Sequence, residues 1–381
     1  MLLIRNAKVL PMVGPDLDRG DILIDDEGKI AEVGPGLKAP AGCAVVDAEG
    51  LWALPGFIDA HCHLGMWEDG MGFEGADGNE ATDPVTPQLR AIDAINPMDT
   101  CFREARENGV TTACTGPGSA NVLGGQFAAV KTYGNRIDDM IVKAPLAMKA
   151  ALGENPKTVY HEQKKAPTTR MGTASIFRET MVAAEEYRKK LDSDELPDRS
   201  LKLEALVSVL EGNLPIKIHA HRADDILTAI RLAKEFDLDY SIDHCTEGYL
   251  IADVLKAEGS KVILGPLLSE RSKIELKNLT FEAPAIMARA GVKFAMMTDH
   301  PVIPLQYLPV CASLAVREGL DERTALESIT INAAQIVGID ERVGSLEPGK
   351  DADIVLYNGN PLDWKVRAQR VFIDGKEVFR R

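Results

Sequence analysis

The middle of the sequence alternates between helical and strand patterns, and this alternation limits the possible folds more than any other feature. Residues 96–115 predict a helix with Asn96 as its N-cap, followed by a glycine stop and the strand VTTACT. The order of helix, turn and strand recurs over residues 224–243, 247–265 and 282–299. Repeated units of this kind predict a parallel sheet with helices on its outside.

We therefore predict an α/β fold with a closed (β/α)8 TIM barrel over residues 55–341. A doubly wound sheet is less favoured because no G-x-G-x-x-G motif opens a helix. The chain ends differ from the barrel, since residues 1–54 and 342–381 are short β-branched runs separated by turn residues. We expect these two ends to form one small β-sandwich module beside the barrel.

Composition narrows the classes of partner and location. The formal net charge is −15 and the sequence pI is about 5.0, so we expect neither nucleic acid nor a membrane surface as a partner. The N-terminus does not resemble a signal peptide, and no apolar stretch approaches the roughly 20 residues of a spanning helix. The six cysteines form no C-x-x-C motif, which favours a reduced cytoplasmic location. A small-molecule substrate is the expected partner, and a homo-oligomer remains open.

Two histidines stand one residue apart in PGFIDAHCH, a run that otherwise predicts a buried strand. Side chains alternate along a strand, so His61 and His63 project to the same face. If this run is the first barrel strand, both imidazoles lie at the C-terminal rim, where barrel enzymes carry their chemistry. Neutral imidazoles in this arrangement suit a divalent ion such as Zn²⁺. The alternative is a pair of hydrogen-bonded core histidines.

Further histidines and one aspartate follow other predicted strands. His219 and His221 share a face after the apolar run LPIKI, and His244 ends the strand in DYSIDHC. Asp299 ends the strand in VKFAMMTD, and Pro301 prevents that strand from continuing. Because the C-terminal ends of barrel strands meet at one rim, we expect these side chains to converge.

Together these segments resemble the amidohydrolase superfamily along the whole chain. The resemblance rests on PGFIDAHCH, on HAH after a strand, on DHC at the next strand, on TDH late in the chain and on the C-terminal GSLEPGKDADIVLYNGNPL. Within the superfamily, the sequence looks most similar to the imidazolonepropionase and dipeptidase-like branch. The resemblance implies a metal-dependent hydrolase with one or two divalent ions, with Zn²⁺ as the expected metal.

By this resemblance, four residues match metal ligands, namely His61, His63, His219 and Asp299. His244 matches either a ligand of a second metal or a group that polarises the attacked carbonyl. Asp299 would also act as general base and acid, because it can accept a proton from the attacking water and return it to the leaving nitrogen. His244 and Asp299 are therefore the catalytic residues that the resemblance implies.

Members of the family with two metals also take a ligand from a middle strand, often a lysine that carries added CO₂. Lys149, in APLAMKAALGENPK, lies in a similar context and matches this ligand. Glu154 is a rival, because its carboxylate needs no modification. Lys149 could also be a surface lysine without a role in the site.

Other residues near the expected rim are candidates for contact with the substrate. His221 is expected inside the barrel mouth as a substrate contact, with a structural histidine as the alternative. The glycine-rich residues 116–126 could form a loop that lines the site. Arg170 and Arg222 could each bind a substrate carboxylate in bidentate fashion, or could be surface charges.

The predicted activity is metal-dependent hydrolysis of an amide, cyclic amide or other C–N bond in a small molecule. An amidohydrolase-type deaminase is the nearest alternative, although deaminases of the superfamily usually place a glutamate where this chain has Arg222. A metal-free barrel scaffold without activity is a second alternative. It is less favoured because every expected type of ligand is present.

Overall fold

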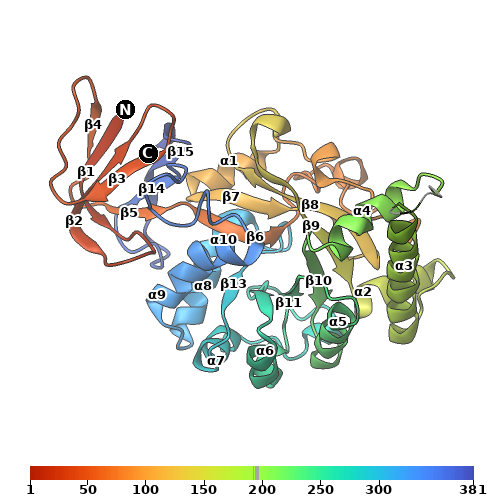
Figure 1. Cartoon of the computed structure of the whole chain (residues 1–381). Coiled ribbons are helices and arrows are strands. Elements are labelled where there is room, and N and C mark those ends of the chain that lie inside the picture. The colour runs from red at the N-terminus through yellow and green to blue at the C-terminus, as the bar shows by residue number, and fades with distance from the viewer. Residues whose placement is uncertain (192, 194–196) are drawn as a thin grey trace.

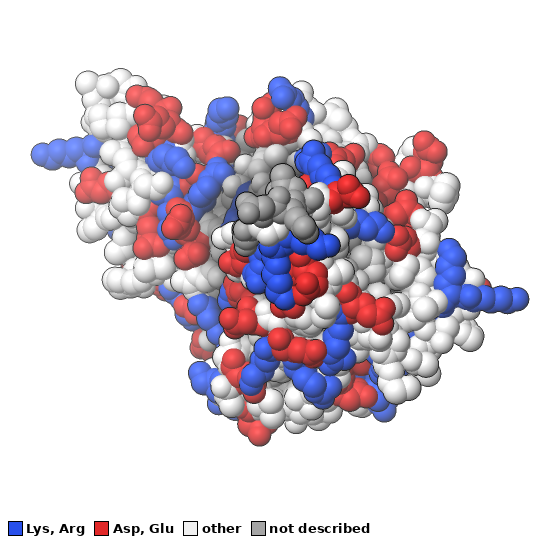
Figure 2. All heavy atoms as spheres, turned by 45° about the vertical axis from the view of Figure 1, so that its right-hand side comes forward, with Lys and Arg blue, Asp and Glu red and all other residues white. Residues whose placement is uncertain are grey.

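The computed structural model describes residues 1–191, 193 and 197–381. It contains two sheets, one in a barrel and one in a smaller module that holds both chain ends (Figure 1). The sequence prediction of an α/β barrel with a β module built from both termini is confirmed. On the face seen in Figure 2, acidic and basic side chains are interspersed.

Eight strands form the barrel sheet and neighbour one another in chain order. They are β6 (Phe57–Cys62), β7 (Val110–Thr115), β8 (Leu123–Lys131), β9 (Ile141–Ala151), β10 (Ile216–Ala220), β11 (Tyr240–His244), β12 (Lys261–Leu264) and β13 (Phe294–Met296). The two ends of the sheet meet just beyond β6 and β13, where the Asp299 backbone N–H donates to the His61 carbonyl at 3.3 Å. The His63 N–H likewise donates to the His300 carbonyl at 2.8 Å. These bonds bring the first and last strands together at the rim.

One strand departs from the parallel order expected from the sequence. β8 runs antiparallel to both β7 and β9. The reason is the short connection 116–122, since a parallel crossover needs about a dozen residues or more. The segment 116–126, expected to be a loop, therefore lies partly in β8, and only its first part remains a loop at the rim.

Ten α-helices are found in the described part of the chain, and those of the repeated units cover the outside of the barrel (Figure 1). They are α1 (Thr100–Glu107), α2 (Glu154–Glu162), α3 (Arg170–Leu191), α4 (Leu201–Leu210), α5 (Ala223–Glu235), α6 (Ala252–Glu258), α7 (Ala283–Arg289), α8 (Leu308–Arg317), α9 (Glu322–Ser328) and α10 (Ile331–Val337). Short 3-10 helices lie in the connections: η1 (Gly72–Gly75), η2 (Ala91–Asp93), η3 (Ile137–Asp139), η4 (Gly248–Ile251), η5 (Ile274–Leu276) and η6 (Leu305–Tyr307). Across the described residues, no helix combines the length and the apolarity that crossing a membrane requires.

The start of α1 differs from the sequence prediction. The N-cap is Asp99, whose carboxylate accepts a hydrogen bond from the backbone N–H of Cys101 at 3.3 Å. Asn96 instead accepts from the N–H of Met98 in the preceding turn. Asparagine and aspartate are both good caps, so the pattern N-P-M-D offers two starts, and the structure uses the second.

The module formed by the chain ends contains one continuous sheet in the order β16-β15-β14-β5-β1-β2-β3, with β4 paired to β1. Its strands are β1 (Leu2–Val9), β2 (Leu17–Ile24), β3 (Ile30–Gly34), β4 (Ala44–Asp47), β5 (Trp52–Pro55), β14 (Ile354–Tyr357), β15 (Ala368–Ile373) and β16 (Lys376–Arg380). The antiparallel pair β5–β14 joins the two ends of the chain. Apolar residues of both ends, among them Ile4, Ile22, Ile354 and Phe372, form one buried cluster.

Candidate metal centre

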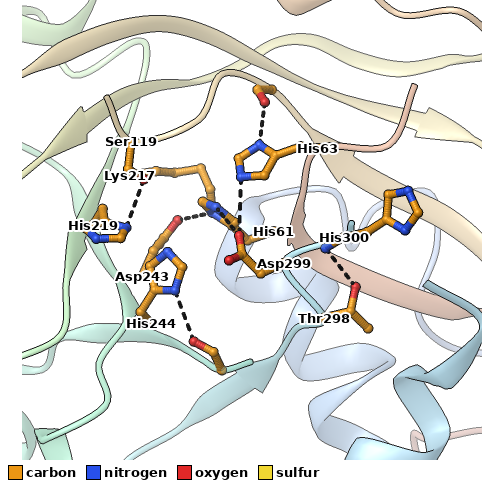
Figure 3. Close-up of polar contacts among 12 residues, drawn as sticks. His61, His63, Ser119, Lys217, His219, Asp243, His244, Thr298, Asp299 and His300 are labelled. Carbon is orange, nitrogen blue, oxygen red and sulfur yellow. Dashed lines mark hydrogen bonds and ion pairs between the residues drawn. The ribbon is translucent and has the colours of Figure 1, made fainter. Parts of the chain in front are cut away.

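The structure brings the histidines and the aspartate singled out in the sequence to one mouth of the barrel (Figure 3). Each comes from the C-terminal end of a strand or from the residues directly after it. His61 lies in β6, His219 in β10 and His244 in β11, while His63 and Asp299 follow β6 and β13. Strand order thus assembles residues that are far apart in the sequence.

His63 has its protonation pattern fixed by a backbone carbonyl. Its Nδ1 lies 2.7 Å from the carbonyl oxygen of Gly116, which can only accept a hydrogen bond. The proton of a neutral His63 must therefore be on Nδ1, and Nε2 carries a lone pair. That Nε2 lies 3.2 Å from Oδ1 of Asp299, so two electron-rich atoms face each other.

His61 is held in the same way by a carboxylate. Its Nδ1 lies 2.5 Å from Oδ2 of Asp243, and its Nε2 lies 3.6 Å from Oδ1 of Asp299. Burial, aided by the positive charge of Lys149, lowers the pKa of His61 to about 3. A neutral imidazole with its free nitrogen turned to the mouth is the form that binds a metal ion.

His244 completes this set from the other side of the mouth. Its Nδ1 lies 3.1 Å from the carbonyl oxygen of Gly265, and its buried Nε2 has no hydrogen-bond partner. Burial lowers the pKa of His244 well below its ordinary value, so this ring is also neutral. Nitrogen or oxygen atoms of His61, His244 and Asp299 all lie within 4.8 Å of one another, as a shared ion requires.

His219 and His221 form a second group with His244, whose candidate ligand atoms also lie within 4.8 Å of one another. Nδ1 of His219 lies 2.8 Å from the hydroxyl of Ser119, in the rim loop after β7. Nδ1 of His221 lies 2.7 Å from the hydroxyl of Thr246. Both pKa values are lowered, chiefly by burial, and that of His221 falls to about 3.

Asp59, a buried residue of β6, positions the segment that carries Asp299. Its Oδ2 accepts hydrogen bonds from the backbone N–H and the hydroxyl of Thr298, at 2.9 and 2.5 Å, and its Oδ1 accepts from the N–H of His61 at 3.0 Å. Asp299 itself has φ 55°, a conformation that is uncommon for a residue with a side chain. The carboxylate of Asp59 thus ties the segment that follows β13 to β6.

Sequence reasoning missed the pair Asp243 and Lys217, both of which are fully or almost fully buried. The Lys217 ammonium lies 3.0 Å from Oδ2 of Asp243, the same oxygen that contacts His61. Burial opposes the ionisation of Asp243, but Lys217 and His61 outweigh it and hold the pKa of this carboxyl low. The available signal was a charged residue inside each of two apolar strands, IKIHA and YSIDH.

Of the two rivals for the middle-strand ligand, Lys149 is the one at the mouth. Its Nζ lies 3.3 Å from Nε2 of His61 and is completely buried. Burial lowers the pKa of Lys149 to about 8. Glu154 begins α2 instead, and its carboxylate accepts a hydrogen bond from the backbone N–H of Glu275 at 3.3 Å.

A cavity of about 470 Å³ opens above these residues. Its lining includes four of the mouth histidines and Asp299, together with an aromatic and aliphatic wall of Trp67, Leu268, Val302 and Ile303. Trp67 packs edge-on against His63, with ring centroids 4.9 Å apart. The two arginines considered for substrate binding are already paired, Arg170 with Asp225 and Arg222 with Asp224.

The donor set fits a divalent cation. His61, His63 and His244 present nitrogen lone pairs, and Asp299 adds an oxygen atom without a hydrogen-bond donor. Nε2 of His244 and Oδ1 of Asp299 are buried without a hydrogen-bond partner in the protein alone, which is unfavourable unless a cation binds them. Neutral nitrogen with carboxylate oxygen is also the donor chemistry that Zn²⁺ and related ions accept.

Comparison with known proteins gives close structural agreement. The crystal structure of an amidohydrolase from Thermotoga maritima MSB8 superimposes with a TM-score of 0.97 at 45% sequence identity, and covers 100% of both chains. Among curated proteins, amidohydrolase tasK of Hapsidospora irregularis is 29% identical over 392 residues. An adenine deaminase of Listeria monocytogenes is 28% identical over 367 residues. Imidazolonepropionases of Cupriavidus species match at 25% identity.

The amidohydrolase tasK and the adenine deaminase are longer proteins than this chain. Their alignments cover 94% and 93% of this chain but 40% and 54% of the relatives, so the chain spans about half of their length or less. At the family level the match is direct, because residues 52–378 fit the model of the Amidohydrolase family. The resemblance noted in the sequence is thereby confirmed, and this chain is a member of the amidohydrolase family.

Proposed function

We propose that this chain is a metal-dependent hydrolase that cleaves an amide, cyclic amide or other C–N bond in a small molecule. One observation carries the proposal. At the barrel mouth, the Nε2 lone pairs of His61, His63 and His244 converge on Oδ1 of Asp299, which accepts no hydrogen bond. Family membership supports the reaction class. The size of the cavity, about 470 Å³, supports a small substrate, since ligand pockets commonly enclose 300–1,000 Å³.

The residues at the mouth suit one or two divalent ions, with Zn²⁺ as the expected metal. His61, His63 and Asp299 would hold one ion, and His219 with His244 would hold a second. Lys149, once carboxylated by CO₂, would join the two sites. When bound, such an ion lowers the pKa of a water molecule from 15.7 to about 7 and polarises the attacked carbonyl.

Asp299 is the proposed proton carrier of the reaction. Its carboxylate would accept the proton of the attacking water and deliver it to the leaving nitrogen. Asp59 is a positioning residue for Asp299, because the hydrogen bonds that Asp59 accepts from Thr298 and His61 fix the segment that carries Asp299. Nε2 of His61 and Nε2 of His63 lie 3.6 and 3.2 Å from Oδ1 of the Asp299 carboxylate, so these three atoms would bind one ion together.

For His244, the contacts favour the ligand role over the polarising role. A histidine that polarises a carbonyl must donate a proton, but the Gly265 carbonyl holds the proton of a neutral His244 on Nδ1. The Nε2 that faces the mouth then has only a lone pair to offer. His221 stays a proposed substrate contact, since it lines the cavity above the proposed ion sites.

Metal removal tests this function. The protein would be depleted of metal with a chelator, reloaded with Zn²⁺, and assayed on N-acyl amino acids, dipeptides and cyclic ureides, with the ions per chain measured in parallel. We expect loss of turnover on depletion, recovery on reloading and one or two ions per chain. Full turnover by metal-free protein would refute the proposal, and a chain that binds no ion would favour the scaffold.

Lys149→Ala tests the two-ion arrangement. Removing the proposed bridging group should reduce the bound ions from two to one per chain, because an alanine cannot carry the carbamate. The measurement is elemental analysis after gel filtration, with Lys143→Ala, an exposed residue of the same strand, as the matched control. Two retained ions in Lys149→Ala would remove this lysine from the ligand set.

Deamination is the second candidate, and one contact favours it. Arg222 is paired with Asp224, but Oε1 of the buried Glu275 lies 3.8 Å from Nε2 of His219 and has no hydrogen-bond partner. A carboxylate at this place could carry protons for a ring nitrogen. Ammonia release from adenine or related amino-heterocycles, measured on the metal-loaded protein beside the amide panel, separates the two reactions.

A further inference from the structure

We propose that the substrate carries a carboxylate next to the scissile C–N bond, and that Lys273 with Asn155 forms the subsite that binds it. This inference rests on the proposed hydrolysis and specifies its substrate class. The class is N-acyl amino acids, including dipeptides, in which the carboxylate is separated from the cleaved nitrogen by a single carbon atom.

Lys273 is a cation on the cavity wall without an acidic partner. It lies just before η5, half-buried in the lining of the cavity. Its ammonium donates one hydrogen bond, to Oδ1 of Asn155 at 2.6 Å. Within residues 1–191, 193 and 197–381, no carboxylate oxygen lies within 4.0 Å of this ammonium. A cation so placed can bind an anionic group without first breaking an ion pair.

The position of Asn155 places this cation close to the reacting centre. Nδ2 of Asn155 lies 3.4 Å from Nε2 of His219, one of the proposed ligands, while its Oδ1 holds Lys273. The amide side chain therefore spans the gap between the lysine and the proposed ion site. A substrate whose carbonyl carbon faces the ions would reach Lys273 with a group attached only one or two bonds beyond the nitrogen.

The other cations considered for this role are neutralised. Arg170 donates to both carboxylate oxygens of Asp225, at 2.8 and 3.1 Å. Arg222 makes a two-point contact with Asp224, at 2.9 and 2.7 Å. Neither arginine belongs to the cavity lining, whereas Lys273 does. The structure thus moves the expected carboxylate contact from the arginines to the lysine.

The remaining wall fits the rest of such a molecule. Trp67, Leu268 and Ile303 give the cavity an apolar side that suits an aliphatic or aromatic group. Glu270 also lines this cavity and is exposed. In the reaction, the carbonyl carbon gains the oxygen of water and the C–N bond breaks. One water proton remains with the new carboxylic acid or is released from it, and the other goes to the amine of the amino acid.

Paired probes that differ only in charge test the subsite. Metal-loaded protein would be given the N-acetyl derivatives of leucine, methionine and phenylalanine, each as the free acid and as the carboxamide, with acetate release as the readout. Wild-type protein should prefer the acids. In Lys273→Met we expect KM for the acids to rise about tenfold to a hundredfold with kcat changed far less, because a hydrogen bond to a charged group is lost. KM for the carboxamides should stay the same.

Controls separate this inference from folding defects and from the proposed function. Lys273→Arg keeps the charge and should keep the preference for acids, while Lys277→Met removes an exposed lysine of the same segment and should change nothing. Binding of the acids and carboxamides by calorimetry supplies the same comparison if turnover is slow. If the wild-type protein has the same KM and the same affinity for acids and carboxamides, the subsite is overturned. An equal rise of KM for both kinds of probe in Lys273→Met would also overturn it. Turnover that survives metal removal would instead overturn the proposed function.

Discussion

Two clusters of buried charge in this molecule are built in opposite ways. At the junction of the barrel and the terminal module, the Lys131 ammonium lies 2.7 Å from Asp353, 2.9 Å from Asp351 and 3.3 Å from Asp374. Asp351 is further bound by Arg342 at 2.8 Å. Each charge at the junction therefore has a protein partner of opposite sign.

At the barrel mouth the protein leaves three buried acceptor atoms without partners. Oδ1 of Asp299, Nε2 of His244 and Oε1 of Glu275 are buried and lack hydrogen bonds. The junction is complete with the chain's own residues, whereas the mouth is complete only with a cation. The contrast teaches that unsatisfied buried acceptors which converge on one barrel mouth identify a binding site more specifically than buried charge alone.

The largest expected effect separates the two clusters by function. Asp299→Asn should reduce hydrolysis about 10⁴-fold, since it removes the proposed proton carrier and an anionic ligand together. The free energy of unfolding should change far less than turnover, because Oδ1 of the carboxylate has no hydrogen bond to lose in the metal-free protein. Steady-state turnover and urea unfolding of metal-free protein measure the two quantities. Near-normal turnover in this variant would remove Asp299 from the mechanism.

Lys131→Met should show the reverse pattern. Three carboxylates would lose their shared ammonium, and breaking a buried ion pair on one side commonly costs about 3–5 kcal/mol of unfolding free energy. Turnover per folded molecule should be close to that of the unchanged protein, because the junction is remote from the proposed ligands. Lys29→Met, which removes a half-exposed partner of Asp351, is the matched control with a smaller cost. A stability equal to that of the wild type would contradict the structural role of Lys131.

Asp243→Asn sharpens the comparison, because Asp243 belongs to the mouth yet is fully partnered. It would weaken the hydrogen bond that keeps the His61 proton on Nδ1 and leave Lys217 without its counter-charge. Loss of such a supporting carboxylate typically costs 10–100-fold in metal affinity. Calorimetric titration with Zn²⁺ measures this, and Asp239→Asn, which loses only an exposed ion pair with Lys261, should keep the normal affinity. Unchanged affinity in Asp243→Asn would show that His61 needs no such support.

Acid should weaken the junction through Asp351. Burial opposes ionisation of this carboxyl, but the charges of Lys131, Lys29 and Arg342 dominate and lower its pKa to about 2. A carboxyl with a lowered pKa stabilises the folded state above its unfolded pKa near 4, and that contribution is lost as pH falls toward 2. The shift corresponds to about 2 kcal/mol. In urea unfolding at pH 5, 4 and 3, the free energy of unfolding should therefore decline less in Asp351→Asn than in the wild type. Parallel declines in the two proteins would exclude Asp351 as the source of the acid sensitivity.

Much of the fold could be predicted because its signals are local. Helix–strand repeats gave the barrel, and β-branched ends gave the terminal module. The antiparallel direction of β8 was not predicted, because its residues favour a strand of either direction. The direction depends instead on the short connection between β7 and β8. The start of α1 was ambiguous between two good caps.

The site was predictable as far as alternation and strand ends allow. His61, His63 and His219 reach the mouth as alternation predicts, but alternation places Asp243 and His244 on opposite faces. Both contribute to the site because His244 has φ 72°, which breaks the strand pattern at its end. The pairing of Lys217 with Asp243 depends on which strands become neighbours, so the sequence alone could not supply it.

The most direct test of the account is the location of metal in a crystal grown with Zn²⁺. Anomalous diffraction measured on both sides of the zinc absorption edge would give the position of every bound ion. The account predicts a peak within coordination distance of His61, His63 and Asp299, with none at the Lys131 junction. A barrel mouth without an anomalous peak, while zinc occupies only surface residues, would contradict it.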